Sequence, residues 1–159
     1  MNGILRFVVY GKPVTQGHKR GFINRSTGRV NIVEQNHDGH ASWREAVRAE
    51  AQRAVTEAAV GLIEGPVCVS LFFGVTKPKS APKKRPTFPI GKVADVDTLA
   101  RCVLDSLSGV VFGDDGQVTV LKVNKDYTAR PGVVVEIRDG TGLVLHPWEL
   151  LPGGLEVAQ

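Results

Sequence analysis

Five aspartates lie close together in the second half of the chain: Asp95, Asp97, Asp105, Asp114 and Asp115. Only one residue separates Asp95 from Asp97, so an extended backbone there would point both side chains to the same side. The loop after the following helix could return Asp114 or Asp115 to the same place. Such crowding costs on the order of several kcal/mol unless one carboxylate stays protonated or a cation neutralises the cluster.

Magnesium is the cation that best suits this group of side chains. It prefers hard oxygen ligands, keeps part of its water shell and accepts a few carboxylates together with phosphate oxygens. Such a site suits the metal-assisted hydrolysis of a phosphodiester. Simpler roles remain open, because Asp97 could be the N-cap of a helix, and Asp114 and Asp115 could be turn formers.

Two helices and four strands must position these carboxylates. Apolar residues at helical spacing predict a helix from Ser42 to Ala59, where Ser42 and Glu45 match an N-terminal capping box. The same spacing predicts a second helix that starts near Asp97 and stops at Gly109. The predicted strands are Leu5 to Tyr10, Val67 to Val75, Gln117 to Val123, and a stretch after Pro131-Gly132 in which Val133, Val135 and Ile137 alternate with Val134, Glu136 and Arg138.

The order of these elements predicts one α+β domain, a mixed β-sheet with two packed helices in the order β-α-β-α-β-β. The 159 residues, 42% of them hydrophobic, are enough for one core and too few for a second full domain. We expect the domain to cover residues 1–139 and the segment 140–159 to be a tail. Residues 11–40 could form a hairpin or a loop, and Cys68 and Cys102 are expected to be reduced core thiols.

The charge is +4 in total, but it is unevenly placed, which favours an anionic partner. No apolar run approaches the roughly 20 residues needed to span a bilayer, and the N-terminus lacks the features of a signal peptide. We therefore expect no membrane contact and a cytoplasmic location.

The chain resembles the RusA-type Holliday junction resolvases of bacteria and their phages over most of its length, up to Arg138. Each shared motif is short, but their order and spacing together are specific. The motifs are Gly11-Lys12-Pro13, Gly65-Pro66-Val67, Pro78-Lys79-Ser80, the Asp-x-Asp of 95–97, Leu104-Asp105-x-Leu107, Gly109-Val110-Val111, Asp114-Asp115-x-Gln117-Val118 and Pro131-Gly132-Val133.

The resemblance implies the roles of individual residues. Asp95, Asp97 and Asp115 occupy the positions of the family's catalytic magnesium ligands. The family's usual Asp-x-Asp-Asn-x-x-Lys element differs here at two positions, with Thr98 for asparagine and Arg101 for lysine. Arginine keeps the charge and can clamp a phosphate, but it does not readily give up a proton.

Two further carboxylates are expected to support the site without binding metal. Asp105 follows Arg101 by four residues and could form an ion pair with it. Asp114 could hold the turn that carries Asp115. The resemblance also implies a homodimer that cuts a four-way DNA junction symmetrically in a bacterial or phage-infected cell. A broader branched-DNA nuclease and a junction-binding protein with little or no cleavage remain the alternatives.

Basic side chains are expected to contact the DNA backbone, since lysine and arginine neutralise phosphates. Several lie among prolines after the predicted central strand, in a stretch that could also be a solvated linker. The residues predicted to bind DNA are Lys77, Lys79, Lys83, Lys84, Arg85, Lys12, Lys19 and Arg20.

Overall fold

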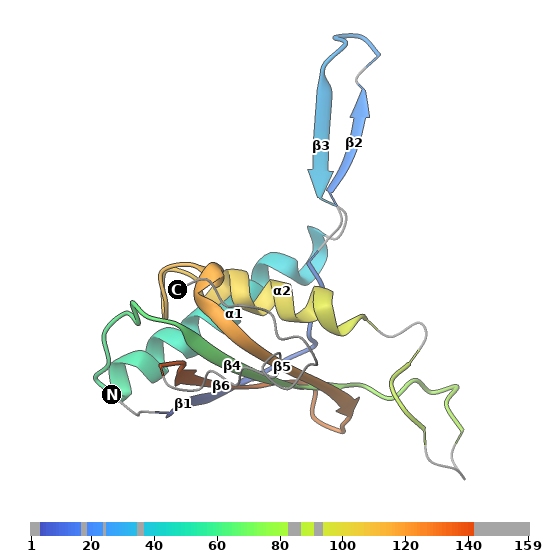
Figure 1. The fold of residues 1–159 in the computed structure, drawn as a ribbon. Coiled ribbons are helices and arrows are strands. Elements are labelled where there is room, and N and C mark those ends of the chain that lie inside the picture. Colours follow the sequence, from blue (N-terminus) through green and yellow to red (C-terminus); the bar gives the residue numbers. More distant parts are fainter. Residues whose placement is uncertain are drawn as a thin grey trace, which may run out of the picture.

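A four-stranded mixed sheet covered on one face by two helices forms the body of the protein (Figure 1). The computed structural model describes residues 4–16, 19–23, 25–34, 37–82, 87–90 and 94–141. Apart from a two-stranded hairpin between the first strand and the first helix, the elements follow the predicted order β-α-β-α-β-β. The predicted α+β fold class is therefore confirmed.

The sheet has the strand order β1-β6-β4-β5. Strand β6 runs antiparallel to both β1 and β4, and β5 runs parallel to β4. Strands β1, β4 and β5 therefore end at the same side of the sheet, which we call the carboxyl edge. The bounds are β1 (Ile4–Tyr10), β4 (Val67–Val75), β5 (Val118–Tyr127) and β6 (Gly132–Asp139).

The core lies between the sheet and the helices α1 (His37–Glu57) and α2 (Val96–Leu107). The side chains of β4 alternate between buried and more exposed, as expected of the predicted central strand. Fully burying one such Val, Leu or Phe side chain contributes about 1.5–3 kcal/mol. The largest fully buried residues include Phe112, Leu71, Leu99, Leu107, Ile137, Val9 and Val47. This packing fixes the direction of α2 relative to the sheet.

The predicted bounds of the first helix were wrong at both ends. The helix begins at His37, so Ser42 lies inside it and is not its N-cap. Gly39 adopts a φ of 89° in the first turn, a backbone conformation that glycine tolerates well. The helix ends at Glu57, and Ala59 follows it with a φ of 51°. The capping pattern at Ser42 therefore did not mark the start of the helix.

The second helix and the last strands lie closer to their predicted positions. Helix α2 ends at Leu107, and Gly109 takes the expected left-handed conformation with a φ of 76°. Strand β5 was predicted to end at Val123 but continues to Tyr127, because its ladder with β4 extends to the pair Val75 and Tyr127. Neither Cys68 nor Cys102 forms a disulfide with a described residue, and Cys102 is buried. Residues 142–159, most of the predicted tail, lie outside the described residues.

The segment between β1 and α1 forms the hairpin that was one of its two predicted conformations. It consists of β2 (Lys19–Ile23) and β3 (Val30–Glu34), paired antiparallel. In Figure 1 the hairpin projects away from the sheet on the side of the two helices. Among the helices described, none has the length and apolar character required to cross a lipid bilayer.

Candidate active site

The start of α2 presents two carboxylates to solvent. Asp95 is the N-cap residue, with φ −71° and ψ 144°, but its side chain makes no capping hydrogen bond. Asp97 lies in the first turn and is therefore not the N-cap. Both side chains are exposed and have no hydrogen bond or ion pair with another described residue. Neither carboxylate is thus occupied by a structural role at this helix end.

Contacts from two other segments hold the start of α2 at the carboxyl edge of the sheet. The Lys125 ammonium on β5 donates a hydrogen bond of 2.7 Å to the carbonyl oxygen of Ala94. The Gln16 backbone N–H, after β1, donates to the carbonyl oxygen of Thr98 at 3.1 Å. Sequence reasoning missed Lys125, because it lies in the part of β5 that was not predicted and no motif marks it. It is a positioning residue for the segment that carries Asp95.

In the turn after α2, the residues of the Asp-Asp-x-Gln motif have different roles. Asp114 caps the short 3₁₀ helix η1 (Asp115–Gln117) and accepts a hydrogen bond from the Gly116 N–H at 2.8 Å. The Gln117 amide oxygen accepts from the Asp114 N–H at 3.0 Å. Its NH₂ group donates to the carbonyl oxygens of Ile63 at 2.9 Å and Gly65 at 2.8 Å. Asp114 and Gln117 therefore build the turn.

Asp115 is the residue of this turn that is left available for chemistry. Its side chain is exposed and has no hydrogen bond or ion pair with another described residue. The expected supporting role of Asp114 agrees with this geometry, since the Asp114 cap holds the turn on which Asp115 stands.

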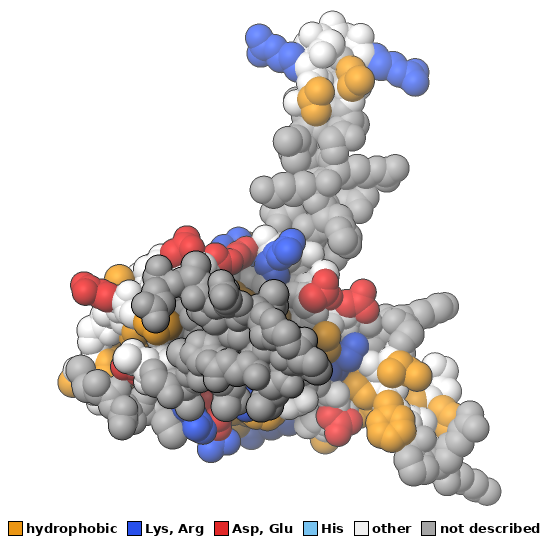
Figure 2. All heavy atoms as spheres, in the orientation of Figure 1, with side chains coloured by type: hydrophobic (Ala, Val, Ile, Leu, Met, Phe, Trp, Pro, Cys, Tyr) orange, Lys and Arg blue, Asp and Glu red, His pale blue; other side chains and the backbone are white. Residues whose placement is uncertain are grey.

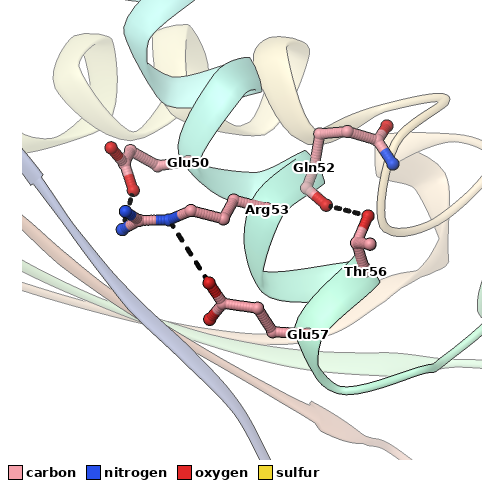
Figure 3. A network of polar contacts seen from close by, with 5 residues as sticks. All are labelled: Glu50, Gln52, Arg53, Thr56 and Glu57. Carbon is pink, nitrogen blue, oxygen red and sulfur yellow. Dashed lines mark hydrogen bonds and ion pairs between the residues drawn. The ribbon is translucent and has the colours of Figure 1, made fainter.

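Replacing Gln117 with alanine should destabilise the fold by about 1 to 3 kcal/mol, because Ile63 and Gly65 lose the donor that bonds their carbonyl oxygens. The change is measured as the midpoint of urea unfolding. Gln52→Ala is the matched control, because the Gln52 side chain makes no bond in Figure 3 and only its main-chain oxygen accepts from Thr56. That control should stay within about 0.5 kcal/mol of the wild type. Equal midpoints for the two variants would contradict the anchoring role.

Helix α2 separates the carboxylates into two groups. Asp95 and Asp97 lie at its start, whereas Asp114 and Asp115 follow its end, and 12 residues of helix span about 18 Å. Figure 2 shows acidic side chains over both ends of α2. Within the described residues, no three His, Cys, Asp or Glu side chains are close enough to hold a metal ion. One chain by itself therefore does not bring Asp115 to the other two aspartates.

The donor chemistry nonetheless fits magnesium at each group. The carboxylates of Asp95, Asp97 and Asp115 offer hard oxygen atoms, are exposed to water and have no competing partner among the described residues. Asp95 and Asp97 are near enough in the chain to serve one ion together. A site with all three carboxylates would need Asp115 from another copy of the chain.

Arg101 and Asp105 lie on the same side of α2 as Asp97, each one helical turn further along. Arg101 is exposed and Asp105 is half-buried. The ion pair expected between them is not present, although both residues are described. The physical reason is the orientation, since an acidic residue four positions after a basic one is the weaker arrangement and lies nearer the negative end of the helix dipole. The Arg101 guanidinium is therefore available to bind an anion.

Basic residues gather at the carboxyl edge, beside the start of α2. Lys12 follows β1, and Lys77 and Lys79 follow β4, and all three are exposed. Arg130, in the turn after β5, lies 4.0 Å over the ring of Tyr10. The other residues predicted to bind DNA are not described in full, since Lys19 and Arg20 lie in β2 without described side chains and Lys83, Lys84 and Arg85 lie outside the described ranges.

Exposed carboxylates beside a lysine-lined edge suit a protein that acts on a polyanionic substrate. The family model for endodeoxyribonuclease RusA matches residues 11–138. The protein YqaN of Bacillus subtilis (strain 168), described as uncharacterized, is 33% identical to the chain over 143 residues, which cover 85% of this chain and 96% of YqaN. The chain belongs to the RusA endodeoxyribonuclease family. The resemblance read from its motifs is confirmed.

Proposed function

We propose that this protein is a magnesium-dependent endodeoxyribonuclease that resolves four-way DNA junctions by paired, symmetric cuts. The observation that carries the proposal is the state of the motif residues in a chain of the RusA family. Asp114 and Gln117 are hydrogen-bonded in the turn, whereas the side chains of Asp95, Asp97 and Asp115 are exposed and bond to no described residue. Structural roles account for the first two residues and leave the three aspartates for chemistry.

The test is incubation of the purified protein with a synthetic immobile four-way junction, with and without magnesium. Cuts at matching positions in two opposite strands, seen only with magnesium, are the expected result. A three-way junction, a Y-shaped fork and a linear duplex are the comparison substrates. Equal cutting of all branched substrates would favour the broader branched-DNA nuclease, and binding without cutting would favour a junction-binding protein.

Asp95, Asp97 and Asp115 would hold the magnesium, which when bound supplies an activated water and neutralises charge at the phosphate. Arg101 lies one helical turn beyond Asp97 and would clamp the scissile phosphate through its planar guanidinium. Lys12, Lys77 and Lys79 at the carboxyl edge would bind the backbone of the same duplex arm, as would the three basic residues Lys83, Lys84 and Arg85.

A homodimer would bring together aspartates that lie at opposite ends of α2 in one chain. If a twofold axis sets the α2 helices of the two protomers antiparallel, the start of one helix lies beside the end of the other. Asp95 and Asp97 of one protomer would then share a metal site with Asp115 of the partner subunit. Each dimer would contain two such sites, one for each of the two strands that must be cut.

The proposal also covers the domain division and the cellular setting. We place the nuclease domain at residues 1–139, followed by a tail at 140–159, and we place the protein in the cytoplasm of a bacterium or a phage-infected host. Junctions that arise during DNA recombination or repair would be its substrates there.

Substitutions of Arg101 distinguish the nuclease from a binding protein that has lost cleavage. If the side chain acts only as a fixed charge, Arg101→Lys should stay within about tenfold of the wild-type rate and Arg101→Ala should lose roughly a hundredfold. If the position must donate a proton, Arg101→Lys should be faster than the wild type. Single-turnover cleavage of one junction by the three proteins measures this. Equal rates for all three would leave Arg101 without a part in the reaction.

A further inference from the structure

The β2–β3 hairpin lies outside the packed body of the protein. Its two strands form their own sheet, in which the pairs run from Lys19 and Glu34 to Ile23 and Val30. The hairpin leaves the body near the start of α2, where the Gln16 N–H bonds to Thr98 (Figure 1). An isolated two-stranded ribbon is marginally stable in water, so a projecting hairpin of this kind favours a role in contact with a partner.

The tip of the hairpin, residues 25–29, is cationic. Arg25 and Arg29 are exposed, and neither has an ion pair with a described carboxylate. Figure 2 shows Lys and Arg side chains extending to both sides of this end of the molecule. Next to them, the cross-strand pair Ile23 and Val30 is exposed by 67% and 64%. The tip therefore offers two positive charges around a small apolar patch.

We propose that the β2–β3 hairpin is a DNA-binding arm that enters the major groove of a duplex arm, where Arg25 and Arg29 contact phosphates on its two walls. The major groove is about 12 Å wide and admits a two-stranded β-ribbon. Strands of five residues reach about 17 Å, which carries the tip well beyond the residues of the carboxyl edge. The apolar pair suits contact with thymine methyl groups on the groove floor. The inference rests on the proposed function only in taking DNA as the ligand.

The test compares the wild type with the double variant Arg25→Ala/Arg29→Ala in binding to a linear duplex and to a four-way junction without divalent metal. Loss of two phosphate contacts should lower the slope of log affinity against log salt by about 1.8 on both substrates. The hydroxyl-radical footprint should also shorten at its end furthest from the branch point. The thermal midpoint should not change, because the two side chains pack against nothing in the body.

A second double variant controls for net charge. Arg6→Ala/Arg53→Ala removes the same number of charges, but each arginine is already paired. Arg6 lies 3.2 Å from Glu136, and Arg53 contacts Glu50 and Glu57 on α1 (Figure 3). This variant should keep the wild-type salt slope and footprint.

The outcomes test the proposed DNA-binding arm separately from the proposed nuclease function. A wild-type slope and footprint in Arg25→Ala/Arg29→Ala would overturn the arm, whether or not the protein cuts DNA. So would loss of the dimer in that variant, measured by sedimentation, since the tip would then bind a second copy of the chain. A reduced slope in a protein that never cuts a junction would support the arm and overturn the nuclease.

Discussion

Replacing Asp97 with asparagine should abolish cleavage of a four-way junction while leaving junction binding nearly intact. Asp97 is exposed in the first turn of α2 and its side chain bonds to no described residue, so the substitution removes a proposed metal ligand and no structural contact. Loss of one preorganised charged group at a phosphoryl transition state typically costs several kcal/mol, so we expect at least a roughly thousandfold slower single-turnover rate. Binding should become slightly tighter, since one negative charge that repels DNA is gone.

Asp126→Asn is the matched control for this result. Asp126 is also exposed and lies near the carboxyl edge, where its side chain accepts a hydrogen bond from the Tyr127 N–H at 2.7 Å. Asparagine keeps an oxygen for that bond, so the rate should not change. If Asp97→Asn cuts as fast as the wild type, the carboxylate serves only the helix dipole and the site lies elsewhere.

Mixing two inactive proteins should restore cleavage if the site is shared between protomers. In a heterodimer of Asp97→Asn and Asp115→Asn chains, one of the two sites would lack both aspartates and the other would be intact. Such a dimer should nick one strand of the junction and should not make the paired cut. Heterodimers purified through two different tags and assayed on a junction with each strand labelled in turn measure this.

The control is the heterodimer of Asp95→Asn with Asp97→Asn, in which neither shared site would be intact. Both aspartates lie at the same end of α2, so each shared site would lack one of them and no activity should return. Absence of nicking in the Asp97→Asn and Asp115→Asn heterodimer would overturn the shared site. The three aspartates would then have to act within one chain, which requires a different path for the segment around α2.

Periodicity was sufficient to predict the elements that are buried on one face. Strand β4 was predicted with its observed bounds because its apolar residues are continuous and packed on both sides by other strands. The end of β5 was missed because this strand lies at the sheet edge, where polar residues such as Asn124 and Asp126 are tolerated. Residue type is a weak indicator of structure wherever one side of an element faces water.

The capping pattern was informative in one place and misleading in another. Ser42 and Glu45 match the capping box but lie inside α1, which begins five residues earlier at His37. Asp114 was read as a possible turn former and, with Gln117, as part of a family motif, and the two residues form the observed capping box. A capping pattern of four residues does not show how the preceding chain enters the helix, so it does not by itself locate the start of the helix.

The separation of Asp115 from Asp95 and Asp97 follows from the topology of the sheet. It could not be predicted from the spacing of these residues in the sequence. Helix α2 connects β4 to a parallel β5, so it must run back across the sheet. Residues before and after such a helix lie at opposite edges, and the 12 residues of α2 between Asp95 and Asp115 span about 18 Å. The expectation that the loop could return Asp114 or Asp115 to Asp95 overlooked this crossing.

The pairing of β1 with β6 makes closure of the sheet depend on the synthesis of β6. In the described sheet β1 has a single neighbour, β6, and their register joins Tyr10 to Gly132. Translation adds about 5–20 residues per second, so roughly 6 to 25 s separate the synthesis of these two partners. Until β6 is made, β1 has no strand to pair with in the described sheet, and β4 has at most β5 beside it. A nascent chain therefore cannot close its sheet before nearly all of the described residues have left the ribosome.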